Sequence, residues 1–493
     1  MAKYQKFLLA ITLLVVFLVV YSPHFNYSFP FHVDEWHHIS EALRFQQPGA
    51  YFNYLTMESV RRASGLEIGF HFILFLISLV FNLVLVYKFL PAIWAVVSAA
   101  VLFWVVYKKT GSKFLLAWLA VVFFGSIKSN VNLTGLWFFT PLTFCIPFVF
   151  LYFYFFSEGI EKKNKKLILL SLAMMSVVVV IHPASISFAI PILALYLIFN
   201  YRYLFSELKF FSVFLILLLV GIIFYQIILG LSWLQFLPSL LDKLQFKSGW
   251  GVLELKNTPT EIYSWLGYLL ALVGAVAIIS EKQTKKYLIY LIWPVVLFLA
   301  LVLYRFTGVS YLSPYQRNWY YFAISLPLLS ALGLGYIIDN FIFYVNDFIT
   351  SQPLRKYFYQ IGLVVIVGLV FLLSFADYYS LPQQAGLYQV INQNDYNTLL
   401  YLKTQPKGLV LALPFISTAL YPLAAQEPIG TIAFYGNRQD VEKFFLSENC
   451  SDRQLIIDKH KPNYIISPYP IDCPFISLIK QIGSNYIYQA KKI

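Results

Sequence analysis

Long apolar runs recur through the first three quarters of the chain, and short polar loops separate them. A membrane-spanning helix needs about 20 apolar residues at a rise of 1.5 Å each. Twelve runs come close to this length, at residues 7–22, 68–87, 91–107, 114–127, 137–156, 167–182, 185–200, 210–230, 262–280, 287–304, 319–339 and 358–375. The pattern predicts an all-α polytopic membrane bundle of about 11–13 transmembrane helices over residues 1–375.

The distribution of basic residues predicts which loops face the cytoplasm. The first run follows Lys3 and Lys6, and no small-residue cleavage site follows it, so we interpret it as a retained anchor with its N-terminus inside. Lysine and arginine gather in loops that are then internal, at 157–166, 200–209, 281–286 and 340–356. Loop 23–67 is external in this topology.

The number of apolar runs conflicts with this orientation. An internal N-terminus and an external C-terminal region require an odd number of crossings, whereas the runs number twelve. Segment 114–127 is short and leads into the polar stretch 126–134. We therefore expect 114–127 to form a half-helix or re-entrant turn, which is tolerated only where protein or a water-filled cavity covers its backbone.

The composition changes at about residue 376. Strand-like runs at 408–413 and 464–467 alternate with helix-like runs at 440–445 and 452–460, and proline and glycine punctuate them. Residues 376–493 are therefore predicted to form a small extracytoplasmic α/β domain. Two cysteines, Cys450 and Cys473, lie in this region and can pair if it is exported, whereas Cys145 lies in an apolar run.

The composition narrows the class of protein. Hydrophobic residues make up 59% of the 493 and charged residues only 12%, against about 25% charged in soluble proteins. The formal charge of +13 is scattered over short loops rather than gathered in one domain, which argues against a nucleic-acid partner. We expect an integral, multi-pass protein of the lipid bilayer, in the plasma membrane, with its C-terminal domain outside.

The densest group of ionisable residues follows the first apolar run. Within it, Asp34 and Glu35 are adjacent carboxylates at the start of external loop 23–67. A carboxylate at the membrane surface can act as a general base toward an acceptor hydroxyl or bind a divalent cation. Alternatively, the pair only caps the helix that follows. We take Asp34 and Glu35 as the candidate catalytic residues.

Two histidines, His37 and His38, follow the carboxylates. Since His38 is four residues from Asp34, the two share a helix face and can pair. Neighbouring helical residues point about 100° apart, so we do not expect both histidines to join Asp34 around one metal. We count His37 and His38 as candidate substrate-binding residues, with a place in an interfacial aromatic belt as the alternative for His37. We assign no metal ligands, and a divalent cation remains open as a cofactor.

Further candidates for substrate binding are cationic or interrupt an apolar run. Arg61 and Arg62, in the second half of the external loop, either grip an anionic headgroup or form a solvated face. Arg317 precedes an apolar helix on the predicted outer side, where it either binds phosphate or snorkels to the headgroups. His182, before Pro183, either lines a cavity or ends a helix.

The order of these features resembles the GT-C class of membrane glycosyltransferases. This class includes protein O-mannosyltransferases, bacterial aminoarabinose transferases and the catalytic subunits of oligosaccharyltransferases. The resemblance rests on an N-terminal anchor, an acidic motif in a long first external loop (Asp34-Glu35), many further helices and a C-terminal extracytoplasmic domain. The resemblance concerns the order of these features and extends over the whole chain.

The resemblance implies transfer of a sugar, with inversion, from a polyprenyl-phosphate donor to a protein, lipid or glycan acceptor on the outer face. Asp34 takes the role of the loop-one acidic residue, Glu35 supports it, and Arg317 looks like the basic residue that holds the donor phosphate. Oligosaccharyltransferases carry metal-binding acidic residues in their second external loop. This chain has Ser129, Asn130 and Asn132 there, which favours the metal-independent branch.

Three other functions compete with this interpretation. A transporter or flippase for a lipid-linked glycan would explain the helices, but transporters commonly show two related halves with paired broken helices. Here one candidate break, at His182-Pro183, has no evident partner. An O-antigen polymerase or ligase would carry its large functional loop late in the chain. A non-catalytic scaffold would tolerate replacement of Asp34 and Glu35 by the corresponding amides, asparagine and glutamine.

Overall fold

The computed structural model describes most of the chain. The described residues are 1–46, 67–129, 135–182, 184–213, 216, 223, 232, 238, 245–247, 259–311, 313–348, 361–362, 364–366, 368–373, 385–432 and 436–491. They divide into two compact units. The helical unit comprises residues 1–20, 92–137 and 145–379, and the mixed unit comprises residues 21–91, 138–144 and 380–493.

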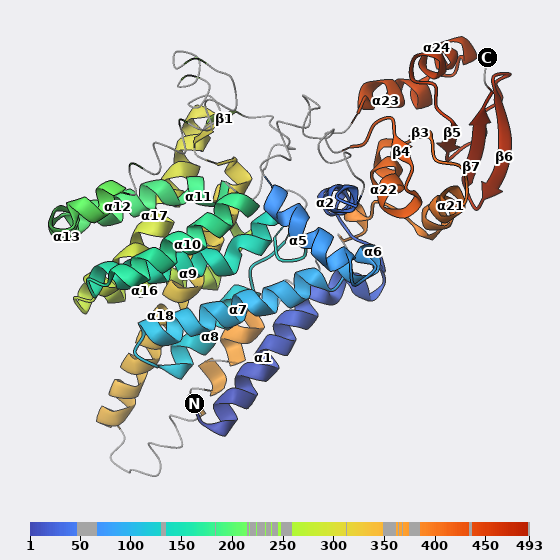
Figure 1. Ribbon diagram of the computed structural model, residues 1–493. Helices are drawn as coiled ribbons and strands as arrows, with labels where there is room; N and C mark the ends of the chain where they lie inside the picture. Colours follow the sequence, from blue (N-terminus) through green and yellow to red (C-terminus); the bar gives the residue numbers. More distant parts are fainter. Residues whose placement is uncertain are drawn as a thin grey trace. The chain divides into compact units, whose positions relative to one another are not determined.

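Apolar helices build the helical unit (Figure 1). Its elements are α1 (Lys3–Tyr21), α7 (Leu90–Lys109), α8 (Phe114–Gly125), α9 (Pro141–Glu161), α10 (Lys165–Ile181), α11 (Ala184–Ser187), α12 (Ala189–Phe199), α13 (Tyr201–Ser206), β1 (Gln245–Lys247), η2 (Pro259–Glu261), α16 (Trp265–Ser280), α17 (Thr284–Thr307), β2 (Val309–Tyr311) and α18 (Tyr315–Phe348). Residue 21 of α1, residues 90–91 of α7 and the first four residues of α9 belong to the mixed unit. Long α18 packs against α8, α16 and α17.

Within the described ranges, five helices are long and apolar enough to cross a membrane, at Lys3–Phe25, Leu90–Lys109, Pro141–Glu161, Thr284–Thr307 and Tyr315–Phe341. Four shorter apolar helices accompany them, at Ile68–Ser78, Phe114–Gly125, Ser185–Phe199 and Trp265–Ser280, and the described residues 364–366 and 368–373 are helical as well. The predicted class, a helical membrane bundle with a small mixed-sheet domain, is confirmed. Most of the predicted runs 210–230 and 358–375 lies outside the described residues.

Two apolar runs depart from uninterrupted spans. The run 68–87 is predicted as one helix, but the structure has two, α5 (Ile68–Ser78) and α6 (Leu83–Tyr87). The side chain of Asn82 caps α6 by accepting a hydrogen bond from the backbone N–H of Leu85, which explains the new start. Helix α8 has 12 residues, a length of about 18 Å, which is shorter than a hydrocarbon core of about 30 Å. That 114–127 is the segment that does not span stays a prediction.

Two glycines allow α16 and α18 to approach closely. A Cβ atom at Gly274 would lie 2.1 Å from the carbonyl oxygen of Leu329, and one at Gly333 would lie 1.9 Å from that of Leu270. Any larger residue would therefore collide with backbone rather than with a movable side chain. Small residues serve this purpose in membrane helix pairs, where packing replaces the hydrophobic effect as the driving force.

The mixed unit combines three regions of the chain. Its elements are η1 (Ser22–Phe25), α2 (Val33–Arg44), α5, α6, η4 (Ala385–Tyr388), α21 (Gln393–Lys403), β3 (Leu409–Ala412), α22 (Pro414–Ala424), β4 (Glu427–Pro428), α23 (Arg438–Leu446), α24 (Cys450–His460), β5 (Tyr464–Ser467), β6 (Ile476–Ile482) and β7 (Asn485–Ala490). The sheet has the order β4-β3-β5-β7-β6, with β3 parallel to β4 and β5 and with antiparallel pairs β5–β7 and β6–β7.

The sheet carries its own hydrophobic core. Helices α23 and α24 cover one face, and α21 and α22 lie on the other (Figure 1). The covered face buries Leu411, Ile465 and Tyr488 against Val441 and Phe444 of α23. Residues Tyr464–Ser467 are buried without alternation, as expected for a strand with helices on both faces.

The predicted elements of the C-terminal region are confirmed. The runs 408–413 and 464–467 form β3 and β5, and the runs 440–445 and 452–460 lie in α23 and α24. The domain limits of 1–375 and 376–493 stay a prediction.

A disulfide bond links Cys450, the first residue of α24, to Cys473, which is buried in the core of the sheet. The two Cα atoms are 5.7 Å apart, and 23 residues separate the cysteines in sequence. The bridge therefore joins α24 and the segment before β6, with β5 between them in sequence. Cys145 lies buried in the helical unit.

The disulfide is expected to stabilise the C-terminal part of the mixed unit. A loop of this length corresponds to about 3 kcal/mol in the chain-entropy description. The Cys450→Ser/Cys473→Ser variant of the full chain should expose residues 436–491 to protease at a lower urea concentration than wild type. Reductant should shift wild type in the same way and leave the variant unchanged. A wild-type midpoint that ignores reductant would contradict a stabilising role.

Candidate functional site

The acidic motif lies in the first turn of α2. Residue His32 is the N-cap, and its Nδ1 accepts a hydrogen bond from the backbone N–H of Asp34 at 3.2 Å. In return, the carboxylate of Glu35 accepts the backbone N–H of His32 at 3.1 Å, which completes a capping box. The positive end of the helix dipole favours both carboxylates at this position.

Glu35 is fully buried, and its carboxylate accepts hydrogen bonds from the backbone of two segments that lie far apart in sequence. One carboxylate oxygen, Oε2, accepts the N–H groups of Phe31 at 2.7 Å and of His32. The other, Oε1, accepts the N–H of Phe139 at 2.9 Å, from a segment 104 residues later in the chain. Glu35 therefore holds the segment before α2 against the segment before α9.

The burial of Glu35 changes its acidity. It raises the pKa of Glu35 to about 7, while the backbone donors Phe139, His32 and Phe31 act in the opposite direction. A carboxyl group whose pKa rises on folding stabilises the fold most when it is protonated. The contribution of Glu35 to stability should therefore fall as the pH rises from about 4.5 to about 7.

Asp34 has a different environment from its neighbour. Its side chain is 33% exposed, and Oδ2 lies 3.4 Å from Nδ1 of His32. Asp34 is thus the accessible carboxylate of the pair, with an imidazole beside it. The sequence did not single out His32 as a cap, because histidine is not among the residues preferred at the N-cap.

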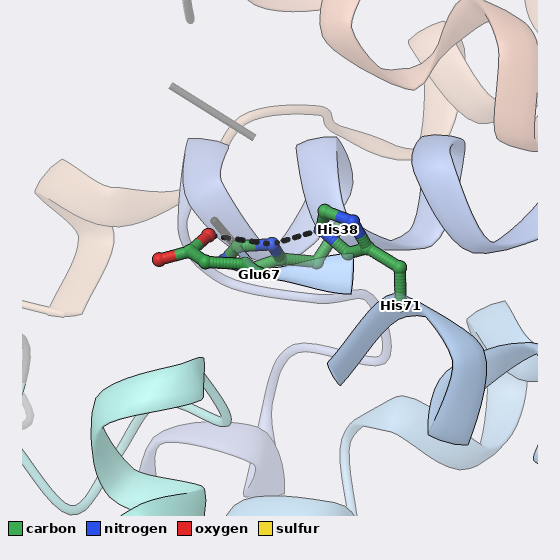
Figure 2. Close-up of side chains that lie close together, drawn as sticks. All are labelled: His38, Glu67 and His71. Atoms are coloured by element: carbon green, nitrogen blue, oxygen red, sulfur yellow. Dashed lines mark hydrogen bonds and ion pairs between the residues drawn. The ribbon is translucent and has the colours of Figure 1, made fainter. Parts of the chain in front are cut away.

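His38 lies beside two ionisable residues that the sequence analysis did not consider. Its Nδ1 lies 3.0 Å from Nε2 of His71 and 3.9 Å from Oε2 of Glu67 (Figure 2). The predicted pairing of His38 with Asp34 stays a prediction. The side chain of His37 is half-buried, and its ring centroid is 5.7 Å from that of His38.

The sequence missed Glu67 and His71. Glu67 is the N-cap of α5 and His71 lies one turn later, so their spacing of four residues puts both on one face. A histidine at the start of an apolar run was the available signal, and its nearness to His38 was not.

The far end of α2 is anchored to the C-terminal part of the mixed unit. The guanidinium of Arg44 donates hydrogen bonds to both carboxylate oxygens of Glu427, at 3.0 and 2.8 Å. It also lies over the ring of Tyr421, 4.0 Å from the centroid. Helix α2 packs against α22 and α5 between these contacts. The helix that carries Asp34 is therefore fixed at both ends.

Two predicted residues come together within the helical unit. His182 follows the last residue of α10, and its Nδ1 lies 2.7 Å from Oγ of Ser185 and 3.3 Å from the hydroxyl of Tyr321 on α18. Arg317, in the first turn of the same α18, is near enough to His182 to interact with it electrostatically. The other predicted cations, Arg61 and Arg62, lie outside the described residues.

A network of short polar side chains sets the start of α18. Asn318 accepts a hydrogen bond from the hydroxyl of Ser313 and donates one to that of Ser310 at 3.0 Å. These bonds tie Ser310 and Ser313 to the first turn of α18, which also carries Arg317.

Comparisons with solved structures identify the fold. The oligosaccharyltransferase of Archaeoglobus fulgidus in its apo form matches with a TM-score of 0.59 and 13% identity, over 95% of this chain and 70% of that one. ArnT from Cupriavidus metallidurans, also in the apo state, matches with a TM-score of 0.56 and 11% identity, over 98% of this chain and 97% of that one. No protein-family model matches the sequence, and no curated protein is significantly similar to it.

The chain therefore has a GT-C-like fold, as the layout of its sequence suggested. A further structure of the Archaeoglobus fulgidus enzyme is a complex with zinc and sulfate, and it matches with a TM-score of 0.57 and 14% identity, over 92% of this chain and 67% of that one. Identities this low establish the fold alone.

Replacing Glu35 by glutamine is expected to destabilise the protein. The amide can present one oxygen to Phe31 and His32, but its NH₂ group then faces the N–H of Phe139. A buried donor without an acceptor costs about 1–3 kcal/mol. Glu35→Gln should lower the melting temperature of the detergent-solubilised chain, and the difference from wild type should be larger at pH 5 than at pH 8. The reason is that only wild type loses the contribution of the protonated Glu35 carboxyl group over this range. Equal melting temperatures of wild type and variant at both pH values would refute the structural role of Glu35.

Proposed function

We propose that this chain is a membrane glycosyltransferase that moves a sugar from a polyprenyl-phosphate-linked donor to an acceptor on the outer face of the membrane. The GT-C-like fold supports the class. One observation supports the reaction: an accessible carboxylate, Asp34, is held at the N-terminus of a doubly anchored helix by a buried one, Glu35. Function has to be argued from such a site, since one fold hosts many activities.

The donor class follows from the fold and from what the neighbours bind. Another structure of the Archaeoglobus fulgidus oligosaccharyltransferase contains an inhibitory peptide and a dolichol-phosphate. We infer a lipid-linked donor for this chain as well, because apolar helices make up most of the helical unit. The acceptor is a protein, lipid or glycan with a nucleophilic group.

The proposed reaction inverts the configuration at the anomeric carbon. The acceptor oxygen attacks this carbon from the side opposite the lipid phosphate and forms the new glycosidic bond. The bond from carbon to phosphate oxygen breaks, and the phosphate leaves with the electron pair. Asp34 takes the proton of the acceptor hydroxyl as general base, a role that typically contributes about 10²–10⁴-fold. His32 positions Asp34 through the backbone, because its Nδ1 accepts the N–H of Asp34.

Cations would stabilise the negative charge that develops on the leaving phosphate. We propose Arg61, Arg62 and Arg317 for this role, and His37 and His182 for polar contacts with the substrate, on residue type and position in the sequence. We derive no metal-assisted step, since Ser129, Asn130 and Asn132 replace the acidic residues that the resemblance associates with a metal.

The disulfide bond supports an external position for the C-terminal part. Disulfides persist in oxidising compartments and are rare in the cytosol. Because Cys450 and Cys473 are bonded, we propose that residues 376–493 lie outside the plasma membrane. Arg44 of α2 binds Glu427 within the same unit, so we propose that Asp34 lies on the outer side too.

Asp34→Asn should lower sugar transfer at least about 100-fold, since an amide cannot accept the proton. The measurement is release of sugar from a panel of radiolabelled polyprenyl-phosphate sugars, in membranes that contain equal amounts of wild type or variant. The matched control is Glu281→Gln, which removes an exposed carboxylate from a loop between α16 and α17. Its rate should equal that of wild type.

Equal turnover by wild type and Asp34→Asn would remove the catalytic assignment. Movement of the labelled lipid across the bilayer without release of sugar would instead support the alternative function, a transporter or flippase. The break between α10 and α11 at His182, with its contacts to Ser185 and Tyr321, is the feature that favours this alternative.

The topology should be visible in cysteine labelling. In a background with all three cysteines replaced by serine, Ser28→Cys and Leu446→Cys should react with an impermeant maleimide in intact cells, because both positions are exposed and proposed to be external. Glu281→Cys, in a predicted internal loop, should react only after permeabilisation. Labelling of Ser28→Cys or Leu446→Cys only after permeabilisation would overturn the proposed orientation.

A further inference from the structure

We propose that His38, Glu67 and His71 form a binding site for a divalent metal ion of the zinc class. His38 lies on α2, Glu67 caps α5, and His71 lies one turn into α5. One ligand atom from each side chain lies within 4.8 Å of the other two (Figure 2). This proposal concerns a site distinct from Asp34 and does not depend on the proposed transferase function.

The distances suit coordination after a small adjustment. Zinc binds imidazole nitrogen and carboxylate oxygen at about 2.0–2.2 Å, so two ligand atoms on one tetrahedral zinc are about 3.3 Å apart. Nδ1 of His38 and Nε2 of His71 are already 3.0 Å apart. Oε2 of Glu67 lies 3.9 Å from Nδ1 of His38, and its side chain is 21% exposed, which leaves the carboxylate room to rotate inward.

The type and burial of the ligands select the metal. Two imidazoles and one carboxylate are a donor set that zinc favours, whereas magnesium and calcium favour oxygen alone. His38 is 5% exposed and His71 is fully buried, so both rings are held in place by packing. The single negative charge of Glu67 offsets part of the charge of the ion. Three protein ligands leave the fourth position to water.

The location of the site indicates that the metal would link α2 to α5 and restrict their relative movement. His38 precedes residues 47–66 and Glu67 follows them directly, so the ion would join the parts of the external loop on either side of this segment. It would also link α2 to α5, which already pack against each other. Since Asp34 lies one turn before His38 on α2, the metal would limit movement of the helix that presents this carboxylate. Its ligands are positioning residues and not catalytic ones.

The test is the metal content and affinity of the full chain, purified in detergent without added chelator. Wild type should bind one zinc ion per chain in titration calorimetry and in elemental analysis. It should also give the visible absorption of a tetrahedral cobalt site when cobalt replaces zinc. His38→Gln and His71→Gln should each weaken zinc binding at least about 100-fold, since loss of even an outer partner costs about 10–100-fold. Glu67→Gln, at a half-buried position, tests the same site in a variant whose folding is least at risk.

The matched control is His460→Gln. Nε2 of His460 lies 2.6 Å from Oδ2 of Asp440, so this pair also combines an imidazole with a carboxylate but has fewer ligands. Its loss should leave the zinc content unchanged. Zinc should raise the melting temperature of wild type and of His460→Gln but not that of Glu67→Gln. Absence of stoichiometric zinc from wild type, or equal affinity in wild type and Glu67→Gln, would overturn the proposal. Neither result bears on sugar release by wild type and Asp34→Asn, so the two proposals fail separately.

Discussion

The carboxylate of Glu35 is the contact on which the geometry of the candidate site depends. It is removed from water entirely, and it accepts hydrogen bonds from backbone N–H groups at residues 31, 32 and 139. A buried carboxylate is tolerated only where donors replace its hydration. Since these donors belong to backbone, the contact fixes the course of two segments and not merely the rotamer of one side chain.

This contact also explains why two adjacent carboxylates have different properties. Neighbouring residues of a helix point about 100° apart, so a helix that turns Glu35 into the protein leaves Asp34 toward the surface. The bidentate contact of Arg44 with Glu427 prevents α2 from rotating at its other end. The orientation of Asp34 is thus set by contacts of Glu35 and Arg44, and the pair divides into a buried and a partly exposed carboxylate.

The sequence predicts those structural features that depend on neighbouring residues, and it does not predict those that depend on contacts between residues far apart in the chain. Hydrophobic periodicity is local, and it correctly located α7, α10, α17 and the strand β5. The end of α5 near residue 79 depends on a cap at Asn82 within an apolar run, which hydropathy averages out. Glu35 and His38 also have long-range partners, Phe139 and His71, which lie 104 and 33 positions away, and no local pattern encodes such a contact.

The solved structures share the fold of this chain at only 11–13% identity, so its function has to be argued from individual side chains. Apolar helices of the right length and order can be built from many sequences, because any large aliphatic or aromatic residue satisfies a lipid-facing or core position. A base for proton transfer cannot be exchanged in this way, since it needs an ionisable group with access to substrate and a fixed direction. In the described part of the chain, Asp34 is partly exposed and its helix is held at both ends, and these two observations are why we propose it as the base. The same reasoning separates it from Glu35, whose contacts leave its oxygens no access to an acceptor.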